Sequence, residues 1–270
     1  MDVRLSDGDA GGPLAPGLYT YSIQISHDRL RGENRIADEQ LSFEGRPLYH
    51  GRLDQSAVSE FRGRGIPSFL GQLYKDSGEL GPEVAMDWHL SGVARVQATP
   101  ENRLLMRFRR FFERMIALGI NPASVAAEAP REAAMIEFDG SNFASWLRYL
   151  VGAEAVACRT AERSLHEGPL PGLALFQLEA EGVARVAKAI FDAKPKPISF
   201  RLDELSAGQR ALVILEHALA VVIERGGVLV VDEPANFLAI QEIQPLLARI
   251  KDLTAEGRMQ AILTSHHPIA

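Results

Sequence analysis

Near its carboxyl end the chain carries two continuous apolar runs separated by a helical segment. VLVV at 228–231 and AILT at 261–264 are each long enough for one buried strand, and 240–255 between them has the character of a helix, with Pro245 near its start. Continuous apolar strands belong to parallel sheets, and parallel neighbours are joined by a right-handed crossover. This stretch therefore predicts an α/β unit with a parallel sheet covered on both faces.

A further helix is expected immediately before the first of these strands. Ser206 is a favourable N-cap residue, AGQRALVILEHALAVVIER follows it, and Gly226 and Gly227 end the segment. The preceding ISFRL at 198–202 alternates as a strand. We therefore assign the core of the α/β domain to residues 196–270.

The amino-terminal part is expected to be antiparallel. Residues 1–17 are acidic and rich in Gly and Pro, which predicts a flexible start. YTYSIQIS at 19–26 alternates between apolar and polar residues, and EQLSFEGRPLYH at 39–50 has a turn signal at 45–47. Residues 18–100 are therefore predicted to form an antiparallel β element, followed by an irregular part whose purpose the sequence does not indicate.

Residues 101–195 are predicted to form a helical lobe. ENRLLMRFRRFFERMIALGI at 101–120 has a wide apolar stripe at helical spacing that ends at GINP. AAMIEFDGSNFASWLRYLVG at 133–152 is expected to contain a short strand, a turn at 139–141 and a helix with Phe143, Trp146, Leu147 and Leu150 inward. Residues 153–193 are expected to be mostly helical, with a break at 168–172.

Five arginines crowd the remaining face of the 101–120 helix: Arg103, Arg107, Arg109, Arg110 and Arg114. A basic helix is compatible with DNA contact, for which Arg107 and Arg110 are the candidates, and also with an ordinary solvated face on a helix packed against a core. The formal net charge of −6 argues against wholesale wrapping of nucleic acid. Both interpretations of the helix stay open.

Composition indicates a water-soluble globular protein with a substantial core. The chain has 270 residues, of which 46% are hydrophobic and 24% charged. Cys158 is its one cysteine, so one chain cannot form a disulfide or a multi-cysteine metal site. The sequence contains no signal-peptide pattern and no run of roughly 18 apolar residues. We expect a cytoplasmic protein without a membrane partner.

Reactive side chains follow both apolar runs. VLVV ends on Asp232 and Glu233, and AILT is followed by Ser265 and His266. Ligands of parallel sheets bind beyond the carboxyl ends of the strands. There an aspartate can hold Mg²⁺ through water, a glutamate can activate the attacking water, and a histidine can donate to a phosphate. The plainer alternative is a turn with solvated acids and a half-buried histidine.

LSAGQR at 205–210 adds a second candidate feature. A serine N-cap followed by Ala207 and Gly208 leaves the first amides of the helix unobstructed, so an anion could meet them, the Ser206 hydroxyl and the positive end of the helix dipole. The plainer alternative is a capped helix start. The order LSAGQR, VLVVDEP, TSHHP, with a helix between each pair, favours a nucleotide site.

On these motifs the carboxyl-terminal 75 residues resemble the ABC-type ATPases, and specifically the bacterial ABC-like AAA-domain ATPases related to recombination, SMC-like and overcoming-lysogenisation-defect proteins. DGSNFASWLRYL and the early strands resemble further segments of this family. The resemblance implies a fold of the P-loop NTPase type, with a partial parallel sheet flanked by helices. It also implies ATP and Mg²⁺ as ligands and ATP sandwiched in a head-to-tail dimer.

Carried over residue by residue, the resemblance makes Asp232 the Walker B aspartate, Glu233 the catalytic glutamate and His266 the switch histidine. The signature motif that addresses the nucleotide of a facing protomer would be Ser206, Ala207, Gly208 and Gln209. Two departures stand out: Ala207 replaces a usual glycine, and Ala239 lacks the polar group expected in the loop that communicates across the dimer.

The phosphate-binding Walker A motif is the main departure. No segment matches GxxxxGK[ST], and no lysine follows a glycine anywhere in the sequence. We expect a chain truncated at both ends; the alternatives are a partner chain that bears Walker A, and a module that has lost ATP binding. Under truncation, or with a partner chain that bears Walker A, the protein is an ATPase subunit that works as a homodimer or with that partner. Its role would then be in DNA repair, phage defence or a toxin-type system. The last makes it a binding or structural module that contacts nucleic acid or protein.

Overall fold

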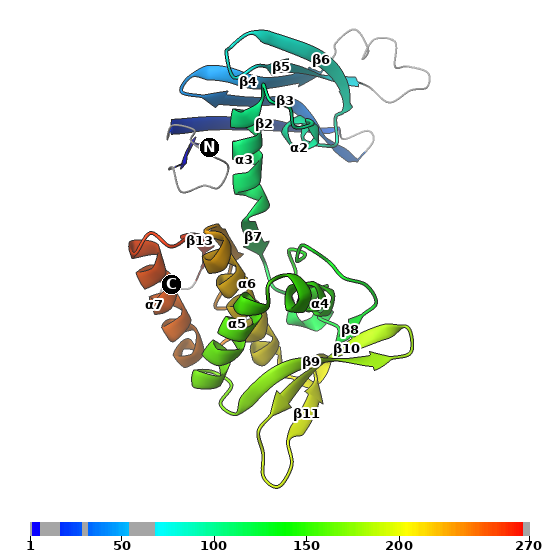
Figure 1. Ribbon diagram of the computed structural model, residues 1–270, viewed down its shortest axis with the longest axis vertical. Helices are drawn as coiled ribbons and strands as arrows, with labels where there is room; N and C mark the ends of the chain where they lie inside the picture. The colour runs from blue at the N-terminus through cyan, green and yellow to red at the C-terminus, as the bar shows by residue number, and fades with distance from the viewer. Residues whose placement is uncertain (1, 6–16, 29–31, 54–67, 267–270) are drawn as a thin grey trace. The chain divides into compact units, whose positions relative to one another are not determined.

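The computed structural model describes residues 2–5, 17–28, 32–53 and 68–266, and the chain divides into two compact units (Figure 1). Unit 1 comprises Met1–Glu113 and unit 2 comprises Arg114–Ala270. The chain has a mixed α/β fold with antiparallel and parallel sheets.

Unit 1 is built on a six-stranded antiparallel sheet in which neighbours in sequence are neighbours in space (Figure 1). The predicted turn between the third and fourth strands is present: Glu44 and Gly45 have φ values of 50° and 75°, the left-handed pair that a two-residue hairpin turn requires. The strands of this sheet are β1 (Asp2–Leu5), β2 (Gly17–Asp28), β3 (Glu33–Phe43), β4 (Arg46–Leu53), β5 (Ser68–Tyr74) and β6 (Leu80–Asp87). The predicted antiparallel element is therefore confirmed, but the sheet also includes β1, in the start predicted to be flexible, and β5 and β6, in the part predicted to be irregular.

Helix α3 (Arg103–Glu113) packs on this sheet through aromatic rings. Tyr19 and Tyr21 of β2 lie 5.5 Å and 5.3 Å from the ring of Phe108, and the Tyr19 hydroxyl donates to the carbonyl of Leu104 at 3.0 Å. The predicted strand at 19–26 is confirmed, but of its apolar face only Tyr19 and Tyr21 point inward. Further along the same face, Ile23 and Ile25 are exposed.

A fully buried carboxylate connects the sheet to the short helix α2 (Gly92–Arg95). Glu39 accepts hydrogen bonds from the Tyr21 hydroxyl at 2.8 Å, the Ser91 hydroxyl at 2.5 Å and the Gly92 amide at 2.7 Å. Burial and the adjacent Glu39 raise the pKa of Tyr21. The three donors compensate the cost of burying the charge.

The helix predicted over 101–120 is shorter than expected. Helix α3 ends at Glu113, and Met115–Leu118 forms strand β7 of unit 2. A four-residue apolar run can form either a helical turn or a strand. Here it forms a strand, because Met115 to Leu118 pair with Val228 to Val231 of the neighbouring strand.

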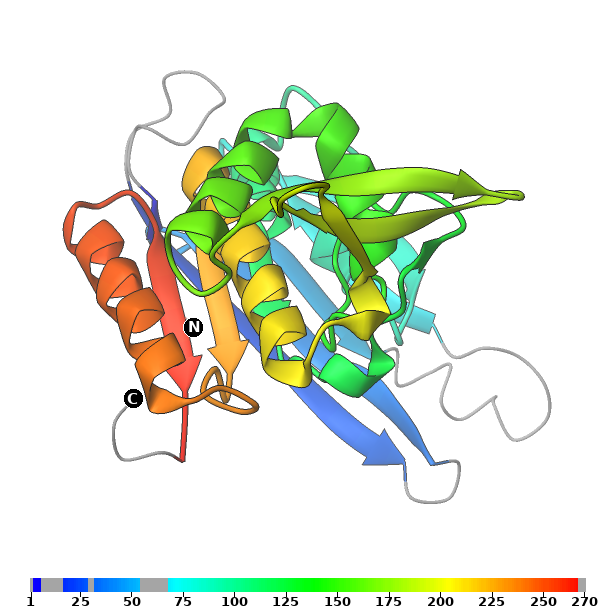
Figure 2. The same cartoon turned by 90° about the horizontal axis from the view of Figure 1, so that it is seen from below.

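The predicted parallel sheet is present in unit 2 (Figure 2). Strand β12 (Val228–Asp232) lies between β13 (Gln260–Thr264) and β7, parallel to both. The expectation that both faces are covered is wrong for β13, where Ile262 is 49% exposed. Helix α7 (Ile240–Ala255) connects the two strands and packs on the sheet, with Ile243, Leu246, Ile250 and Leu253 buried.

A second sheet in unit 2 corrects the prediction of a mostly helical segment at 153–193. After helix α5 (Ala155–Glu167), residues 173–191 form the hairpin of β9 (Leu173–Glu181) and β10 (Ala184–Phe191), which turns at Gly182 with φ 62°. Strands β8 (Glu128–Ala129) and β11 (Ile198–Arg201) also pair with β10. The predicted helical lobe at 101–195 is thus partly sheet, because its apolar residues find strand partners that local periodicity does not reveal.

Helix α6 (Ala207–Arg225) forms the centre of unit 2. Every residue from Ala211 to Val222 is buried, and Gly226 ends the helix in the left-handed conformation, as predicted. Helix α4 (Phe143–Ala153) buries the four expected side chains, but the short strand expected before it is not formed: Met135 and Phe138 are exposed there. None of the described helices is long and apolar enough to cross a bilayer.

Candidate functional site

Asp232 lies at the carboxyl end of β12, opposite Thr264 at the end of β13. The Thr264 hydroxyl donates a hydrogen bond to the Asp232 carboxylate, whose side chain is otherwise exposed. Because the strands are parallel and in register, their polar ends meet at one edge of the sheet. This is the position at which parallel sheets bind ligands.

Glu233 is held more firmly than its neighbour. Its backbone is left-handed, with φ 51°, and its amide donates to the Thr264 carbonyl at 2.9 Å. Its carboxylate accepts the His266 amide at 2.7 Å and the Ser265 hydroxyl at 3.3 Å, and its side chain is 21% exposed. A carboxylate oriented by two donors at the end of a strand can act on a bound water.

His266 meets Glu233 through both its backbone and its ring. Besides the amide contact, the imidazole Nε2 lies 3.7 Å from Glu233 Oε1, and the ring is fully exposed. Asp232, Glu233 and His266 are thus brought together, as expected from their places after adjacent strands.

The LSAGQR segment begins helix α6. Ser206 is its N-cap: its hydroxyl oxygen accepts from the Gln209 amide at 3.2 Å, and the Gln209 side chain accepts from the Ser206 amide at 2.9 Å. This reciprocal capping satisfies two backbone donors at the helix start. No hydrogen bond joins Ser206 or Gln209 to Asp232 or Glu233 in the part of the chain that the structure describes, so these residues form a second, separate group.

A contact that the sequence did not indicate joins the first turn of helix α6 to the loop after Glu233. A Cβ placed on Gly208 would lie 2.8 Å from the carbonyl oxygen of Phe237, so the main chains of the two segments are in direct contact. Phe237 itself is left-handed, with φ 69°, and its side chain is 56% exposed. The sequence gives no signal for this contact, because it depends on the loop conformation.

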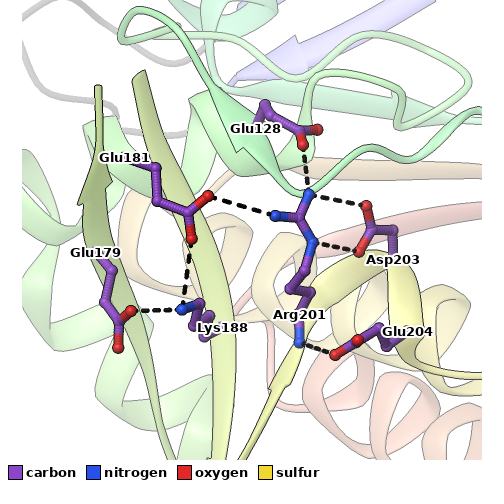
Figure 3. Close-up of polar contacts among 7 residues, drawn as sticks. All are labelled: Glu128, Glu179, Glu181, Lys188, Arg201, Asp203 and Glu204. Atoms are coloured by element: carbon purple, nitrogen blue, oxygen red, sulfur yellow. Dashed lines mark hydrogen bonds and ion pairs between the residues drawn. The ribbon is translucent and has the colours of Figure 1, made fainter. Parts of the chain in front are cut away.

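The segment leading into LSAGQR is anchored by Arg201, which nothing in the sequence pattern singles out (Figure 3). The Arg201 guanidinium contacts Glu128 of β8, Glu181 of β9 at 3.6 Å and Asp203 at 3.1 Å. Its hydrogen bond lowers the pKa of Asp203. Arg201 therefore connects the four-stranded sheet to the residues that lead into LSAGQR.

Lys188 extends the same network. It lies opposite Arg201 across β10 and β11, and it pairs with Glu179 at 2.5 Å and with Glu181 at 3.5 Å (Figure 3). Like charges facing one another destabilise a sheet. Here Glu181 pairs with both cations and offsets that repulsion.

The donor set at the strand ends fits a magnesium ion that arrives with a nucleotide. Asp232 offers a carboxylate, and the described residues hold no cluster of three or more metal-binding side chains. Mg²⁺ is commonly held by one or two carboxylates, with phosphates and water completing its octahedron.

Arg107 does not lie on a solvated basic face. It is 6% exposed, because α3 buries all five residues from Leu104 to Phe108. Arg109 contacts the Val96 carbonyl at 2.8 Å and Glu113 at 3.1 Å. The suggestion of DNA contact through Arg107 is therefore wrong, whereas Arg110 is exposed and its role stays a prediction.

Comparison with solved structures finds a distant likeness. Neither a protein-family model nor a curated protein sequence matches the chain. Among solved structures, it is similar to one described as "Crystal structure of the SmcHead bound to the C-winged helix domain of ScpA", with a TM-score of 0.38 and 13% identity. The match covers 83% of this chain and 68% of that one. No family assignment follows from these comparisons.

Proposed function

We propose that the chain is an ATP-binding and ATP-hydrolysing subunit of the ABC type, in which ATP is held between two facing chains. The observation that carries this proposal is the hydrogen-bonded group at the ends of β12 and β13. There Glu233 is oriented by Ser265 and His266 and lies beside Asp232. A hydrolytic nucleotide site needs this combination of a metal-binding carboxylate and a water-activating carboxylate.

Each residue has a definite task in this proposal. Asp232 binds Mg²⁺ through water, Glu233 orients and deprotonates the attacking water, and His266 donates to the γ-phosphate. The exposed imidazole of His266 supports its task, since the ring can reach a ligand without displacing core side chains. Mg²⁺, when bound, neutralises charge on the phosphates.

The signature segment serves the nucleotide of the facing chain. Ser206 retains its hydroxyl proton and Gln209 retains its amide NH₂ group, because the capping bonds use only their oxygens and backbone amides. Both can therefore donate to a phosphate presented from outside. These 270 residues contain no GxxxxGK[ST], so the phosphate-binding loop is supplied from elsewhere, and the chain alone should hold a metal nucleotide only weakly, through Asp232 and Glu233.

Paramagnetic broadening by Mn²⁺ in place of Mg²⁺ tests the proposal on the chain itself. With millimolar Mn-ATP, the amide resonances of Asp232, Glu233 and Thr264 should broaden, because the metal would lie beside them. Asp232→Asn should abolish the broadening. The matched control, Asp203→Asn, removes a carboxylate of the Arg201 network and should leave it unchanged.

Two outcomes contradict the proposal. Absence of broadening at these amides would favour a binding or structural module that has lost its nucleotide. Broadening elsewhere that survives Asp232→Asn would place the metal nucleotide at another site.

A further inference from the structure

We infer that Gly208 is a positioning residue that fixes the loop carrying Glu233, and that it acts within the same chain through the carbonyl of Phe237. The inference deepens the proposed function and rests on the role given there to Glu233. Gly208 is then the contact between the Ser206–Gln209 segment and the group formed by Asp232, Glu233 and His266.

Space, rather than backbone conformation, requires glycine at this position. Gly208 lies in the first turn of a regular helix, where any residue can adopt the backbone angles. An added Cβ would lie 2.8 Å from the Phe237 carbonyl oxygen and 3.6 Å from Leu238 Cδ2. The first distance is too short for a carbon and an oxygen in ordinary contact, so either the helix or the loop would have to move.

The loop has little freedom to yield. Glu233 and Phe237 are both left-handed, and each non-glycine residue in that state costs on the order of 1–3 kcal/mol unless its surroundings hold it. The Asn236 amide donates to the Glu233 carbonyl at 3.0 Å, and the Ala239 amide donates to Glu242 Oε2 at 2.8 Å. The Phe237 carbonyl therefore lies in a strained, hydrogen-bonded turn that packs directly against the main chain of Gly208, where there is no side chain.

Glu233 belongs to the same turn. Its carbonyl accepts the Asn236 amide, while its carboxylate accepts the His266 amide. A shift of the Phe237 carbonyl passes to Glu233 through the four peptide units between residues 233 and 237. Placement of the signature helix thus sets the orientation of the hydrolytic carboxylate in its own chain.

Hydrogen exchange of single amides, without nucleotide, tests the inference. In Gly208→Ala the amides of Asn236 and His266, whose acceptors both belong to Glu233, should exchange at least about tenfold faster, while the buried amides of Leu215 and Leu219 stay unchanged. Gly152→Ala is the matched control: Gly152 lies in α4 with nothing within 4 Å of an added Cβ. It should leave all four rates unchanged.

A second substitution tests the path through the loop. Phe237→Gly removes the conformational penalty at residue 237 and lets its carbonyl move. The His266 amide of the double variant Gly208→Ala with Phe237→Gly should therefore exchange no faster than the His266 amide of Phe237→Gly alone. Equal rates in the wild type and Gly208→Ala would overturn the inference. So would faster exchange throughout α6, or additive effects of the two substitutions. The Mn-ATP experiment does not depend on these rates, so either proposal can fail alone.

Discussion

Arg249 of α7 forms an ion pair with Glu216 in the middle of the central helix α6, with 2.5 Å between Nη2 and Oε2. The Glu216 side chain is only 4% exposed and that of Arg249 is 34% exposed. The same guanidinium contacts the Ser164 hydroxyl of α5. One arginine therefore connects three helices, at the edge of a cavity of about 440 Å³ that lies between them.

Removing the arginine should destabilise unit 2 more than removing the pair. Arg249→Ala leaves the Glu216 charge buried without its partner, at a cost of about 3 kcal/mol, the lower end of the range for a broken buried pair because Arg249 is partly exposed. Glu216→Leu with Arg249→Leu should recover most of this loss. Urea unfolding of the three proteins measures the difference. A double variant as unstable as Arg249→Ala would contradict the explanation.

His217 should make the protein sensitive to mild acid. It is fully buried between the rings of Phe143 and Phe176, and burial lowers its pKa to about 4 from the ordinary 6.5. Between these values the unfolded chain binds the proton and the folded chain does not, so stability falls as pH falls from 6.5 to 4. The free energy of unfolding should fall by about 1.4 kcal/mol for each pH unit in this window.

The His217→Leu variant isolates this contribution. Denaturant unfolding at several pH values should show a wild-type slope steeper than that of the variant between pH 6.5 and 4, with equal slopes above pH 7. Parallel slopes throughout this window would assign the acid sensitivity to other groups.

The thiol of Cys158 should be unreactive in the folded protein. It is 5% exposed, and burial, followed by the nearby Glu162 and Glu154, raises its pKa to about 12. Because the thiolate is the reactive species, a disulfide reagent at pH 8 should react roughly a hundredfold or more slowly before unfolding than after it. Rapid labelling under native conditions would show that helix α5 opens.

Arg201→Met should raise the pKa of Asp203 toward its usual value. The hydrogen bond from Arg201 is the largest cause of the lowered pKa, so the stabilisation it brings is present above the usual pKa and is lost as pH falls through the depressed one. Carbon-detected NMR titration of Asp203 measures the shift. Lys188→Met is the matched control, because Lys188 pairs with Glu179 and Glu181 and not with Asp203. An unchanged Asp203 pKa in Arg201→Met would contradict the assignment.

The carboxyl-terminal elements could be predicted from sequence because their signals are local. Ser206 and Gly226 mark the ends of α6, and the apolar runs of β12 and β13 are continuous. In contrast, β7 owes its state to pairing with β12, far along the chain, and the β9–β10 hairpin owes its state to pairing between its two strands, which helical or strand periodicity alone does not reveal.

The same distinction applies to the candidate site. The proximity of Asp232, Glu233 and His266 follows from parallel strands that end together, so it could be predicted. The contact between Gly208 and Phe237 depends on two left-handed residues in a turn, and the burial of Arg107 depends on how α3 packs. The catalytic and binding roles of the site residues remain predictions.

Helix α6 is enclosed by the core from Ala211 to Val222, which limits how its first turn can respond to a ligand. Because core side chains pack around the helix from Ala211 to Val222, the helix cannot slide or rotate unless that core opens. A force on Ser206 or Gly208 is therefore passed to the core that packs around Ala211–Val222. In the proposed function, a ligand of a facing chain that binds this first turn would therefore act on the whole core of unit 2, Arg114–Ala270, and not on the helix alone.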